Sequence, residues 1–579
     1  MKCVSLRNNP LCLLLLLLLS QLTHTALANE DFALLDQHGS FHQLSRYLDK
    51  KALVLLVYSN ASPAAERALS GFDSLRTRYQ EQDIVFLLLN AVDEPVAIKQ
   101  KFPDPAVDPR VLIDDAQIVA RTLGVSSLAE VLVLDPDSYR ISYQGALDSS
   151  FLNPSAAGPV QPYVEEVLEA VLAGNELPAD YPAFQGEPLV YRYQQAIGER
   201  EISYQDEIVP ILRRHCTRCH VEEGLAPWAM SSYIMVLGWS PMMRETLITR
   251  RMPPGQIDER IGDWTQSHRL SDEELAVLIE WIDRGAPRQG EDDPLAATMP
   301  ADEEWPAGEP DLIVEVPPET VPATGIVDYL LKTVELDLPA DKWLSGVAYS
   351  AGDKSVLHSL LVYAVDKNAQ ISAPEDLISA RNADFISVFV PGNPIDRFAE
   401  DSGFLLQADQ NLSFKIRYLS SGRETVDASR VGLYFRDTAP KMALSSIALG
   451  AESLSIPANR NNHEEVASSE VLEQDTWVES FSPHAHNRGK SMTVSALYPD
   501  GRQELLINVA NYNYNWQLAY TLRQRKLLPA GTRLQAVTVY DNSIANPFNP
   551  DPEQAVNWGV TTWDEMFVHF VRIARERLQ

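Results

Sequence analysis

The sequence predicts a multidomain protein with an α/β domain first, an all-α domain second and two all-β sandwiches last. Three observations support this order. Continuous apolar runs alternate with helical stretches in the first third of the 579-residue chain. A Cys-x-x-Cys-His sequence lies among helical stretches near the middle. Short strands separated by turn residues fill the second half, and a chain of this length suggests about three or four domains.

The composition is that of a folded, acidic protein. It is 45% hydrophobic and 22% charged, with a formal net charge of −32. Several cores can be buried with this apolar content. Nucleic acid and anionic lipid should repel such a chain, so we expect no nucleic-acid partner. The charge indicates solubility and says nothing about activity.

The N-terminus has the pattern of a secretory signal peptide over residues 1–28. Lys2 and Arg7 supply the basic start, residues 13–19 the apolar run, and Ala26-Leu27-Ala28 the small residues for cleavage. No later stretch approaches the ~20 apolar residues of a membrane span. We therefore expect an exported protein without a membrane span.

The first domain should be a sheet covered by helices. Residues 52–58 form a continuous apolar run, as expected of a strand buried on both faces, and residues 83–89 and 130–134 form two more after a leading Asp83 and Glu130. A helical stretch at 64–79 lies between the first two. This alternation favours a βαβ sheet.

Residues 29–185 resemble the thioredoxin-like fold, close to its peroxiredoxin-like branch. The resemblance implies a reactive cysteine after the first central strand, but this chain has Asn60-Ala61-Ser62-Pro63, with Ser62 as the replacement. Where the family has a cis-proline, the chain has Leu128-Ala129. A hydroxyl cannot carry out thiolate exchange. We expect a redox-inactive docking or structural domain.

The Cys216-Thr217-Arg218-Cys219-His220 sequence has the spacing that attaches a c-type haem. Cys216 and Cys219 would form the two thioethers, and the adjacent His220 would reach the iron as proximal ligand. The cofactor predicted here is haem c.

Two alternatives exist for these thiols. The only other cysteines, Cys3 and Cys12, lie in the leader. A structural zinc site needs four Cys or His ligands nearby, and only His215 and His220 are available beside the thiols. A Cys-x-x-Cys redox pair stays open.

Two helices are expected around this motif. Ser203 with Asp206 can cap a helix that leads into it, and Pro210 predicts a bend there. Ser271-x-x-Glu274 is a capping box that begins a second helix, and Gly285 ends it.

Arg251-Met252-Pro253-Pro254 lies between these helices and offers a sixth haem ligand. A thioether from Met252 would raise the reduction potential, and the prolines stiffen its backbone. The stretch resembles the MPP-containing cytochrome domain of multidomain secreted bacterial proteins, which assigns 186–300 to a cytochrome c-like domain. Met252 could instead be a packing residue, and Met242 and Met243 compete for the role. Haem attachment with export implies the periplasm and a periplasmic electron donor or acceptor.

The remainder should consist of β-sandwiches or jelly rolls. An acidic, proline-rich linker at 292–310 precedes it. Regularly spaced strands are expected at 311–316, 329–338, 356–364 and 413–418. The length accommodates two such domains, at 301–440 and 441–579.

His484 and His486 in Pro483-His484-Ala485-His486 are candidate metal ligands. On a strand, positions i and i+2 face the same way, so both can bind one metal. Two imidazoles with a thioether from the distant Met566 suit copper. Two surface histidines on a strand are the plain alternative.

Residues 310–579 resemble the copper type II, ascorbate-dependent monooxygenases, the family of peptidylglycine α-hydroxylating and dopamine β-monooxygenases. The matching segments are 483–490, 498–501, Asn515-Trp516-Gln517, 541–543, Asn546-Pro547 and Asp564-Glu565-Met566. The resemblance implies one catalytic copper held by His484, His486 and Met566.

The second copper of that family is not expected. Its two adjacent histidines correspond to His358-Ser359 here, and its third histidine to Arg417. Arginine stays protonated and cannot ligate copper. His463 and His569 are further candidates that we interpret as structural.

The first hypothesis is therefore a periplasmic copper-dependent, monooxygenase-like oxidoreductase. A single copper would activate oxygen or peroxide against a C–H bond of a small-molecule or peptide substrate, with electrons from the fused haem. The alternative is an electron-transfer or metal-binding scaffold with a degenerate monooxygenase domain.

Overall fold

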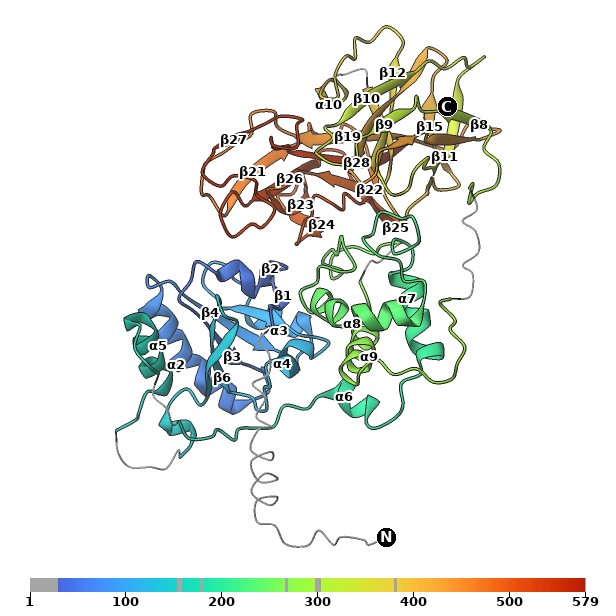
Figure 1. The fold of residues 1–579 in the computed structure, drawn as a ribbon. Coiled ribbons are helices and arrows are strands. Elements are labelled where there is room, and N and C mark those ends of the chain that lie inside the picture. The colour runs from blue at the N-terminus through green and yellow to red at the C-terminus, as the bar shows by residue number, and fades with distance from the viewer. Residues whose placement is uncertain are drawn as a thin grey trace, which may run out of the picture. The chain divides into compact units, whose positions relative to one another are not determined.

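The computed structural model describes residues 30–153, 159–177, 181–265, 269–296, 304–379 and 383–577 (Figure 1). The predicted signal peptide lies outside the described residues. The chain divides into two compact units: one holds the residues up to Gln37 and His42–Arg192, and the other His38–Phe41 and Tyr193–Gln579. Across the described ranges, no helix is both long and apolar enough to cross a membrane.

The first unit is a seven-stranded sheet in the order β2-β1-β5-β4-β3-β6-β7. β3, β4 and β5 run parallel, and β6 is antiparallel to β3. All six residues of β3 are buried, which explains its continuous apolar run. The predicted strands at 52–58, 83–89 and 130–134 and the helix at 64–79 are confirmed. The elements are β1 Ala33–Asp36, β2 Phe41–Gln43, η1 Leu44–Tyr47, β3 Ala52–Val57, α2 Pro63–Tyr79, β4 Ile84–Asn90, α3 Pro95–Lys101, β5 Arg110–Ile113, α4 Ile118–Thr122, β6 Val131–Asp135, β7 Arg140–Gly145, η2 Ser149–Phe151 and α5 Tyr163–Ala173.

The second unit begins with helices. These are α6 Arg192–Ile197, the π-helical turn η3 Tyr204–Ile208, α7 Val209–His215, α8 Tyr233–Ile248 and α9 Asp272–Asp283. Ser203 caps η3 by accepting from the Asp206 amide, as predicted. The capping box of Ser271 and Glu274 is also confirmed. Pro210 lies in the first turn of α7, where its missing N–H is tolerated, and the change of helix type comes just before it.

Strands make up most of the rest of the second unit, and the four strand predictions there are confirmed. The elements are β8 Leu312–Glu315, β9 Glu319–Val321, β10 Leu330–Val334, β11 Lys342–Ser350, β12 Leu357–Asp366, α10 Asp376–Ser379, β13 Ala383–Phe389, β14 Ile395–Arg397, β15 Ser402–Leu406, β16 Gln410–Tyr418, β17 Thr425–Asp427, β18 Arg430–Phe435, β19 Met442–Gly450, β20 Ser455–Ile456, β21 His463–Ser468, β22 Thr476–His484, β23 Gly489–Leu497, β24 Gln503–Val509, β25 Tyr520–Leu528, β26 Arg533–Tyr540, β27 Val556–Asn557 and β28 Val568–Glu576.

One nine-stranded sheet runs through this region in the order β25-β22-β28-β19-β15-β11-β18-β8, with β14 beside β11. It crosses the predicted boundary at residue 440 through parallel pairing of β15 with β19. The two predicted β domains therefore share a sheet. Each half also has a four-stranded sheet, β10-β16-β12-β13 in the first and β21-β26-β23-β24 in the second.

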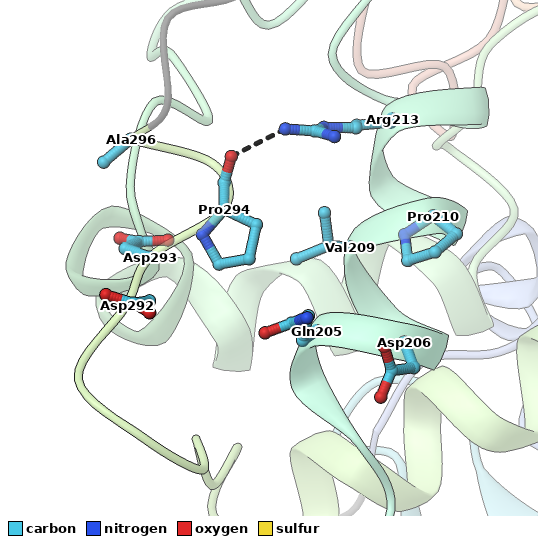
Figure 2. A pocket seen from close by; sticks show the side chains of 9 residues that line it. All are labelled: Gln205, Asp206, Val209, Pro210, Arg213, Asp292, Asp293, Pro294 and Ala296. Atoms are coloured by element: carbon cyan, nitrogen blue, oxygen red, sulfur yellow. Dashed lines mark hydrogen bonds between the residues drawn. The ribbon is translucent and has the colours of Figure 1, made fainter.

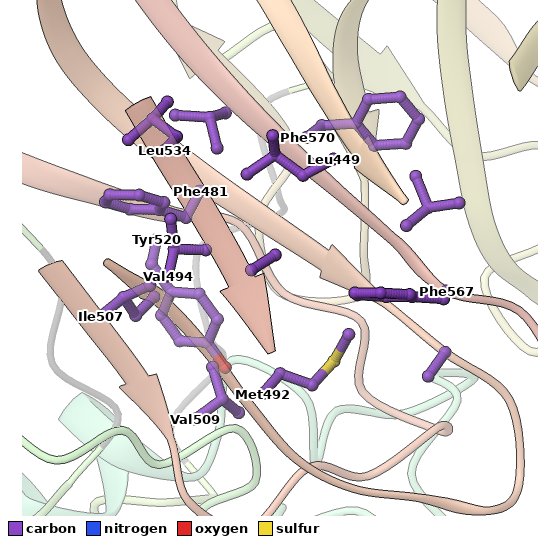
Figure 3. Close-up of a cluster of buried hydrophobic side chains, with 14 of the residues drawn as sticks. Leu449, Phe481, Met492, Val494, Ile507, Val509, Tyr520, Leu534, Phe567 and Phe570 are labelled. Carbon is purple, nitrogen blue, oxygen red and sulfur yellow. The ribbon is translucent and has the colours of Figure 1, made fainter. Parts of the chain in front are cut away.

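Two hydrophobic cores fill this β region. One is built mainly from strands before residue 445, including Leu344, Phe414 and Val431. The other, shown in Figure 3, gathers Phe481, Val494, Ile507 and Phe570 from later strands. The second core also includes Tyr363 and Phe385 of β12 and β13, so the halves are packed together by side chains as well as by the shared sheet.

Candidate metal centres

His484 and His486 lie at and just beyond the end of β22, and both rings are buried. Nδ1 of His486 is 3.1 Å from the Asp564 carbonyl oxygen, which can only accept, so Nδ1 donates. Nδ1 of His484 is 2.9 Å from Oε1 of Gln517. The Gln517 amide is oriented by its Nε2, which donates to the Tyr514 carbonyl, and Nδ1 of His484 therefore also donates.

These bonds leave Nε2 of both rings with the lone pair. Both Nε2 atoms are buried and have no hydrogen-bond partner among the described residues. Burial, aided by the charge of Lys415, lowers the pKa of His486 to about 3 and that of His484 well below its usual value. The ring centroids are 5.4 Å apart. Two neutral, oriented imidazoles with unpartnered Nε2 atoms suit a shared metal ion.

Met566 is fully buried and is connected to the histidines through Glu565. The Glu565 carboxylate accepts from the amides of His486, Arg488 and Met566. Burial raises the pKa of Glu565 to about 7. One buried carboxylate thus joins the backbone of the His-x-His segment to that of the methionine.

No group of three or more His, Cys, Asp or Glu side chains is placed to hold a metal within the described ranges. A centre of two imidazoles and a thioether would not form such a group, because only two of its ligands belong to these four residue types. The donor set of His484, His486 and Met566 suits copper in either oxidation state.

Lys415 of β16 extends into the same region and is only 1% exposed. Its Nζ lies 3.7 Å from Sδ of Met566 and 4.2 Å from the ring centroid of Tyr329. The Tyr329 ring in turn stacks on His486, with centroids 5.9 Å apart. Burial lowers the pKa of Lys415 to about 7. A desolvated cation–π contact offsets only about 2 kcal/mol, less than the several kcal/mol that burying an ammonium costs.

His358 and Arg417 are neighbours in the sheet, and each side chain has other partners among the described residues. Nε2 of His358 donates to the Asn515 carbonyl at 2.7 Å, and burial lowers its pKa to about 3. Arg417 stacks on Tyr514, with Cζ 3.6 Å from the ring centroid. A guanidinium donates hydrogen bonds and binds no cation.

The two remaining histidines of this region have structural partners. His463 bonds Glu465 at 2.8 Å, and His569 bonds the Thr538 hydroxyl at 3.0 Å. Both contacts agree with the structural interpretation of these residues.

The Cys-x-x-Cys-His motif follows α7 directly. Cys216 is the C-cap of that helix, and the amides of Cys219 and His220 both donate to the Cys216 carbonyl. Nδ1 of His220 is 2.9 Å from the Trp228 carbonyl oxygen and therefore donates to it. Nε2 of His220 is left as the atom for a metal bond, as in a haem-ligating histidine.

The surroundings of the two thiols favour their neutral form. Burial raises the pKa of Cys216 to about 12 and raises that of Cys219. Reactive Cys-x-x-Cys thiols have lowered pKa values. Nε2 of His215 is 3.2 Å from a Glu274 carboxylate oxygen, and a zinc site would need His215 together with His220 and both thiols.

Met252 is partly buried just after α8, and the two prolines that follow it lie near the motif. Pro253 and Pro254 line a hollow that also contains Cys219, Gly392, Trp516 and Leu518, which we call the Cys219 hollow. A Cβ on Gly392 would lie 2.9 Å from Sγ of Cys219, so only glycine permits this approach. Of the competing methionines, Met242 is 52% exposed and Met243 is buried in α8.

Residues 513–523 contact both candidate centres. Trp516 and Leu518 line the Cys219 hollow, while Gln517 between them bonds His484. The Tyr520 hydroxyl donates to the Gly255 carbonyl, close to Met252. One stretch of chain therefore joins the haem-attachment motif to the His-x-His site.

A separate pocket of about 830 Å³ lies between α7 and residues 292–296, and its lining side chains are drawn in Figure 2. Val209, Pro210 and Arg213 form one wall, and Arg213 donates to the Pro294 carbonyl at 2.6 Å. None of the predicted site residues lines it.

In the first unit, Ser62 occupies the position of the missing thiol. Its side chain caps α2 by accepting from the Ala65 amide at 3.2 Å and is buried. Ala129, at the position of the family's cis-proline, has φ of 65°. The two positions that shape a thiolate site in this fold thus hold a buried helix-capping serine, Ser62, and an alanine with left-handed backbone, Ala129.

Ser62→Cys is expected to give no thiol-dependent peroxidase activity, because the new thiol would be buried and Ala129 replaces the shaping proline. The measurement is dithiothreitol-dependent loss of hydrogen peroxide, compared with wild type of equal haem content. Ser62→Ala is the matched control and should lower the free energy of unfolding by about 1 kcal/mol through loss of the cap. A clear peroxidase rate above wild type would contradict this prediction.

Comparison with known proteins finds a family match in the first unit. The profile of the AhpC/TSA family matches residues 27–148, so this part of the chain is a thioredoxin/peroxiredoxin-like domain. No curated protein matches the chain. The domain has a peroxiredoxin-type redox fold, in a chain whose large C-terminal region is all-β with several sheets.

Three solved structures are similar to a part of the chain. A hypothetical protein of Sinorhizobium meliloti is 20% identical, with 28% of this chain and 91% of that chain covered and a TM-score of 0.26. Peroxidoxin BcpB of Mycobacterium tuberculosis is 20% identical (25% and 92% covered, TM-score 0.19). The exposed lipoprotein thioredoxin Etrx1 of Streptococcus pneumoniae is 19% identical (20% and 88% covered, TM-score 0.18).

Lys415, Glu565, Gln517 and Tyr329 were not predicted as site residues. Lys415 and Arg417 alternate with Phe414, Ile416 and Tyr418 along β16, so the sequence did place two cations on one strand face. Complete burial of that strand is what makes them unusual, and alternation alone does not predict it.

Proposed function

We propose that the protein is a periplasmic haem- and copper-containing oxidoreductase of monooxygenase type. Bound copper would supply oxygen or peroxide activation against a C–H bond, and the fused c-type haem would supply electrons. The observation that carries the proposal is the pair of buried, unpartnered Nε2 atoms of His484 and His486. The buried Met566 is linked to the same segment because its amide and that of His486 both donate to Glu565. Two surface histidines would have water at their Nε2 atoms, whereas buried polar atoms normally have a partner.

A covalently attached haem is proposed at the Cys-x-x-Cys-His motif. Cys216 and Cys219 would hold the porphyrin and His220 the iron, because its Nδ1 is already bonded to the Trp228 carbonyl. Met252 is proposed as the sixth ligand, supported by the prolines after it in the Cys219 hollow. Electron supply from this haem is supported by residues 513–523, which contact both centres.

A scaffold that only carries electrons or stores metal is the alternative function. Ser359 and Arg417, at positions where the resembled family has histidines, and Ser62, at the position of the thiol, favour it. The two functions differ in whether copper at His484 accepts electrons from haem. Copper analysis of wild type and His484→Ala, followed by the rate of copper reduction with and without haem, decides between them.

Gln517→Leu is expected to weaken copper binding by roughly 10–100-fold, because the amide that orients His484 is lost. The haem spectrum should stay unchanged, since Gln517 does not line the Cys219 hollow. Copper affinity is measured by competition with a chromophoric chelator. Gln503→Leu, an exposed position on β24, is the matched control and should bind copper as wild type does. Equal affinities for the two variants would argue against an orienting role for Gln517.

A further inference from the structure

We infer that the β region of the second unit supplies one wall of the haem pocket, in which residues 390–393 and Trp516 cover the edge of the macrocycle that Cys219 holds. This inference rests on the haem of the proposed function and adds which part of the fold that haem faces. Residues 390–393 form the turn after β13, with a bridge between Val390 and Asn393. Together with Trp516 they line the Cys219 hollow, so segments far apart in the sequence meet at one attachment thiol.

The turn at 390–393 contacts the attachment atom itself. Sγ of Cys219 lies 3.7 Å from the Pro391 carbonyl oxygen. Gly392 has φ of 83°, and a Cβ there would lie 2.9 Å from the same Sγ and 3.3 Å from Cδ of Arg218. Glycine is therefore the residue that lets the turn lie against the sulfur of one thioether bond.

The chain after Met252 also lies against the β region. A Cβ on Gly255, which has φ of 71°, would overlap the Leu518 side chain. The Gly255 carbonyl accepts from the Tyr520 hydroxyl at 3.0 Å. The segment with the proposed sixth ligand and the segment with the attachment thiols thus both adjoin residues 516–520.

The contact between the helical and β regions is firmly held. Trp264 belongs to the core of the second β half and packs edge-on against Phe481 and Tyr520, with ring centroids 6.1 Å and 6.2 Å away. The next residue, Thr265, donates its amide to the Thr521 carbonyl of β25 at 2.9 Å. The wall is therefore part of a packed core and is not a loosely docked surface.

The size of the Cys219 hollow suits an edge of the haem and not the whole macrocycle. Its volume is about 30 Å³, which is room for about two water-sized groups. A thioether bridge of haem c has the carbon bonded to sulfur and a methyl group on it. When the Cys219 thiol adds across a vinyl group, an S–C bond forms and the thiol hydrogen goes to the other vinyl carbon, so no oxidant is needed. This bridge occupies the hollow, and the rest of the macrocycle lies beyond it.

Hydrogen exchange measured by mass spectrometry tests where the wall lies. Haem-loaded wild type is compared with the haem-free Cys216→Ser and Cys219→Ser double variant, both full length and without copper. Peptides that contain Gly392 or residues 516–519 should exchange at least roughly tenfold more slowly with haem attached, because water reaches their amides less often. Peptides from β21, which does not line the hollow, should exchange equally in both proteins. Equal slowing in all peptides, or none at Gly392 and 516–519, would overturn the inference.

A pair of tryptophan variants keeps both thiols in place. In the haem-loaded protein, Trp516→Ser should let water reach the haem edge and lower the reduction potential, because water favours the more highly charged ferric iron. Trp563→Ser is the matched control, since Trp563 is 55% exposed and does not line the hollow. It should keep the wild-type potential, and equal potentials in the two variants would contradict the wall.

A pair of glycine variants separates contact with Cys219 from backbone strain. Gly392 and Gly422 have φ of 83° and 84°, but a Cβ on Gly422 would meet nothing within 4 Å. Gly392→Ala and Gly422→Ala should therefore both unfold at a lower temperature than wild type. Only Gly392→Ala should change the visible spectrum of the haem, because only its new methyl group presses on Sγ of Cys219. An unchanged spectrum in Gly392→Ala would count against the inference.

Covalent haem in wild type is measured first, on the same preparations. If it is present and the variants behave as their controls do, the wall is wrong and the proposed function stands. If wild type carries no covalent haem, the proposed function fails and the wall fails with it.

Discussion

One copper per chain is expected for the wild-type protein, and none for His486→Ala at the same free copper concentration. Nε2 of His486 is buried, unpartnered and held in the ligating tautomer by the Asp564 carbonyl. Loss of a residue that only orients a metal ligand lowers metal affinity by up to roughly 100-fold. Removal of one of three ligands should lower copper affinity by more than that. Metal analysis after gel filtration gives the stoichiometry, and electron paramagnetic resonance should show a single type II signal that the variant lacks.

His463→Ala is the matched control for that experiment. His463 lies on β21 and is bonded to Glu465, so its loss should leave copper content and the resonance signal unchanged. Two equivalents of copper in wild type would contradict the loss of the second site at His358 and Arg417. No copper at saturation would leave only the electron-carrier alternative.

The sequence predicted the order of elements well where hydrophobic periodicity and capping are local properties. The buried strands of the first unit, the capping box of α9 and the four β strands all depend on residues close together in the chain. The shared nine-stranded sheet could not be predicted in this way. It depends on the pairing of β15 with β19, in which Ser402 is opposite Met442, and nothing local encodes such a pairing.

The candidate copper site also contains some residues that the sequence could predict and others that it could not. His484 and His486 could be proposed from a two-residue spacing, and Met566 through a family resemblance. Glu565 was beyond prediction, because its role depends on accepting three backbone amides from distant segments. Lys415 was also beyond prediction, since alternate charged residues on a strand usually face solvent.

Residues 513–523 connect these separate observations. Their position between the Cys219 hollow and His484 offers a physical reason why a chain without the second copper could still deliver electrons. Trp516 lines the hollow, and the next residue, Gln517, bonds the ligand. The hypothesis therefore depends on haem being present at Cys216 and Cys219, which the next experiment tests.

Cys216→Ser with Cys219→Ser is expected to abolish covalent haem completely in a host with cytochrome c maturation, since both thioethers are lost. Wild type should show a six-coordinate c-type spectrum whose haem resists extraction by acidified organic solvent. Met252→Ala should keep the covalent haem, lower its reduction potential and open the sixth position. An unchanged spectrum in Met252→Ala would move the ligand to Met242 or Met243.

The haem-free variant also tests the electron supply. Because His484, His486 and Met566 are untouched, it should still bind one copper, but ascorbate should reduce that copper more slowly than in wild type. The measurement is the anaerobic loss of the Cu(II) resonance signal with time, at equal copper content. Reduction at the same speed without haem would show that the haem does not replace the missing copper site, even if both cofactors are present.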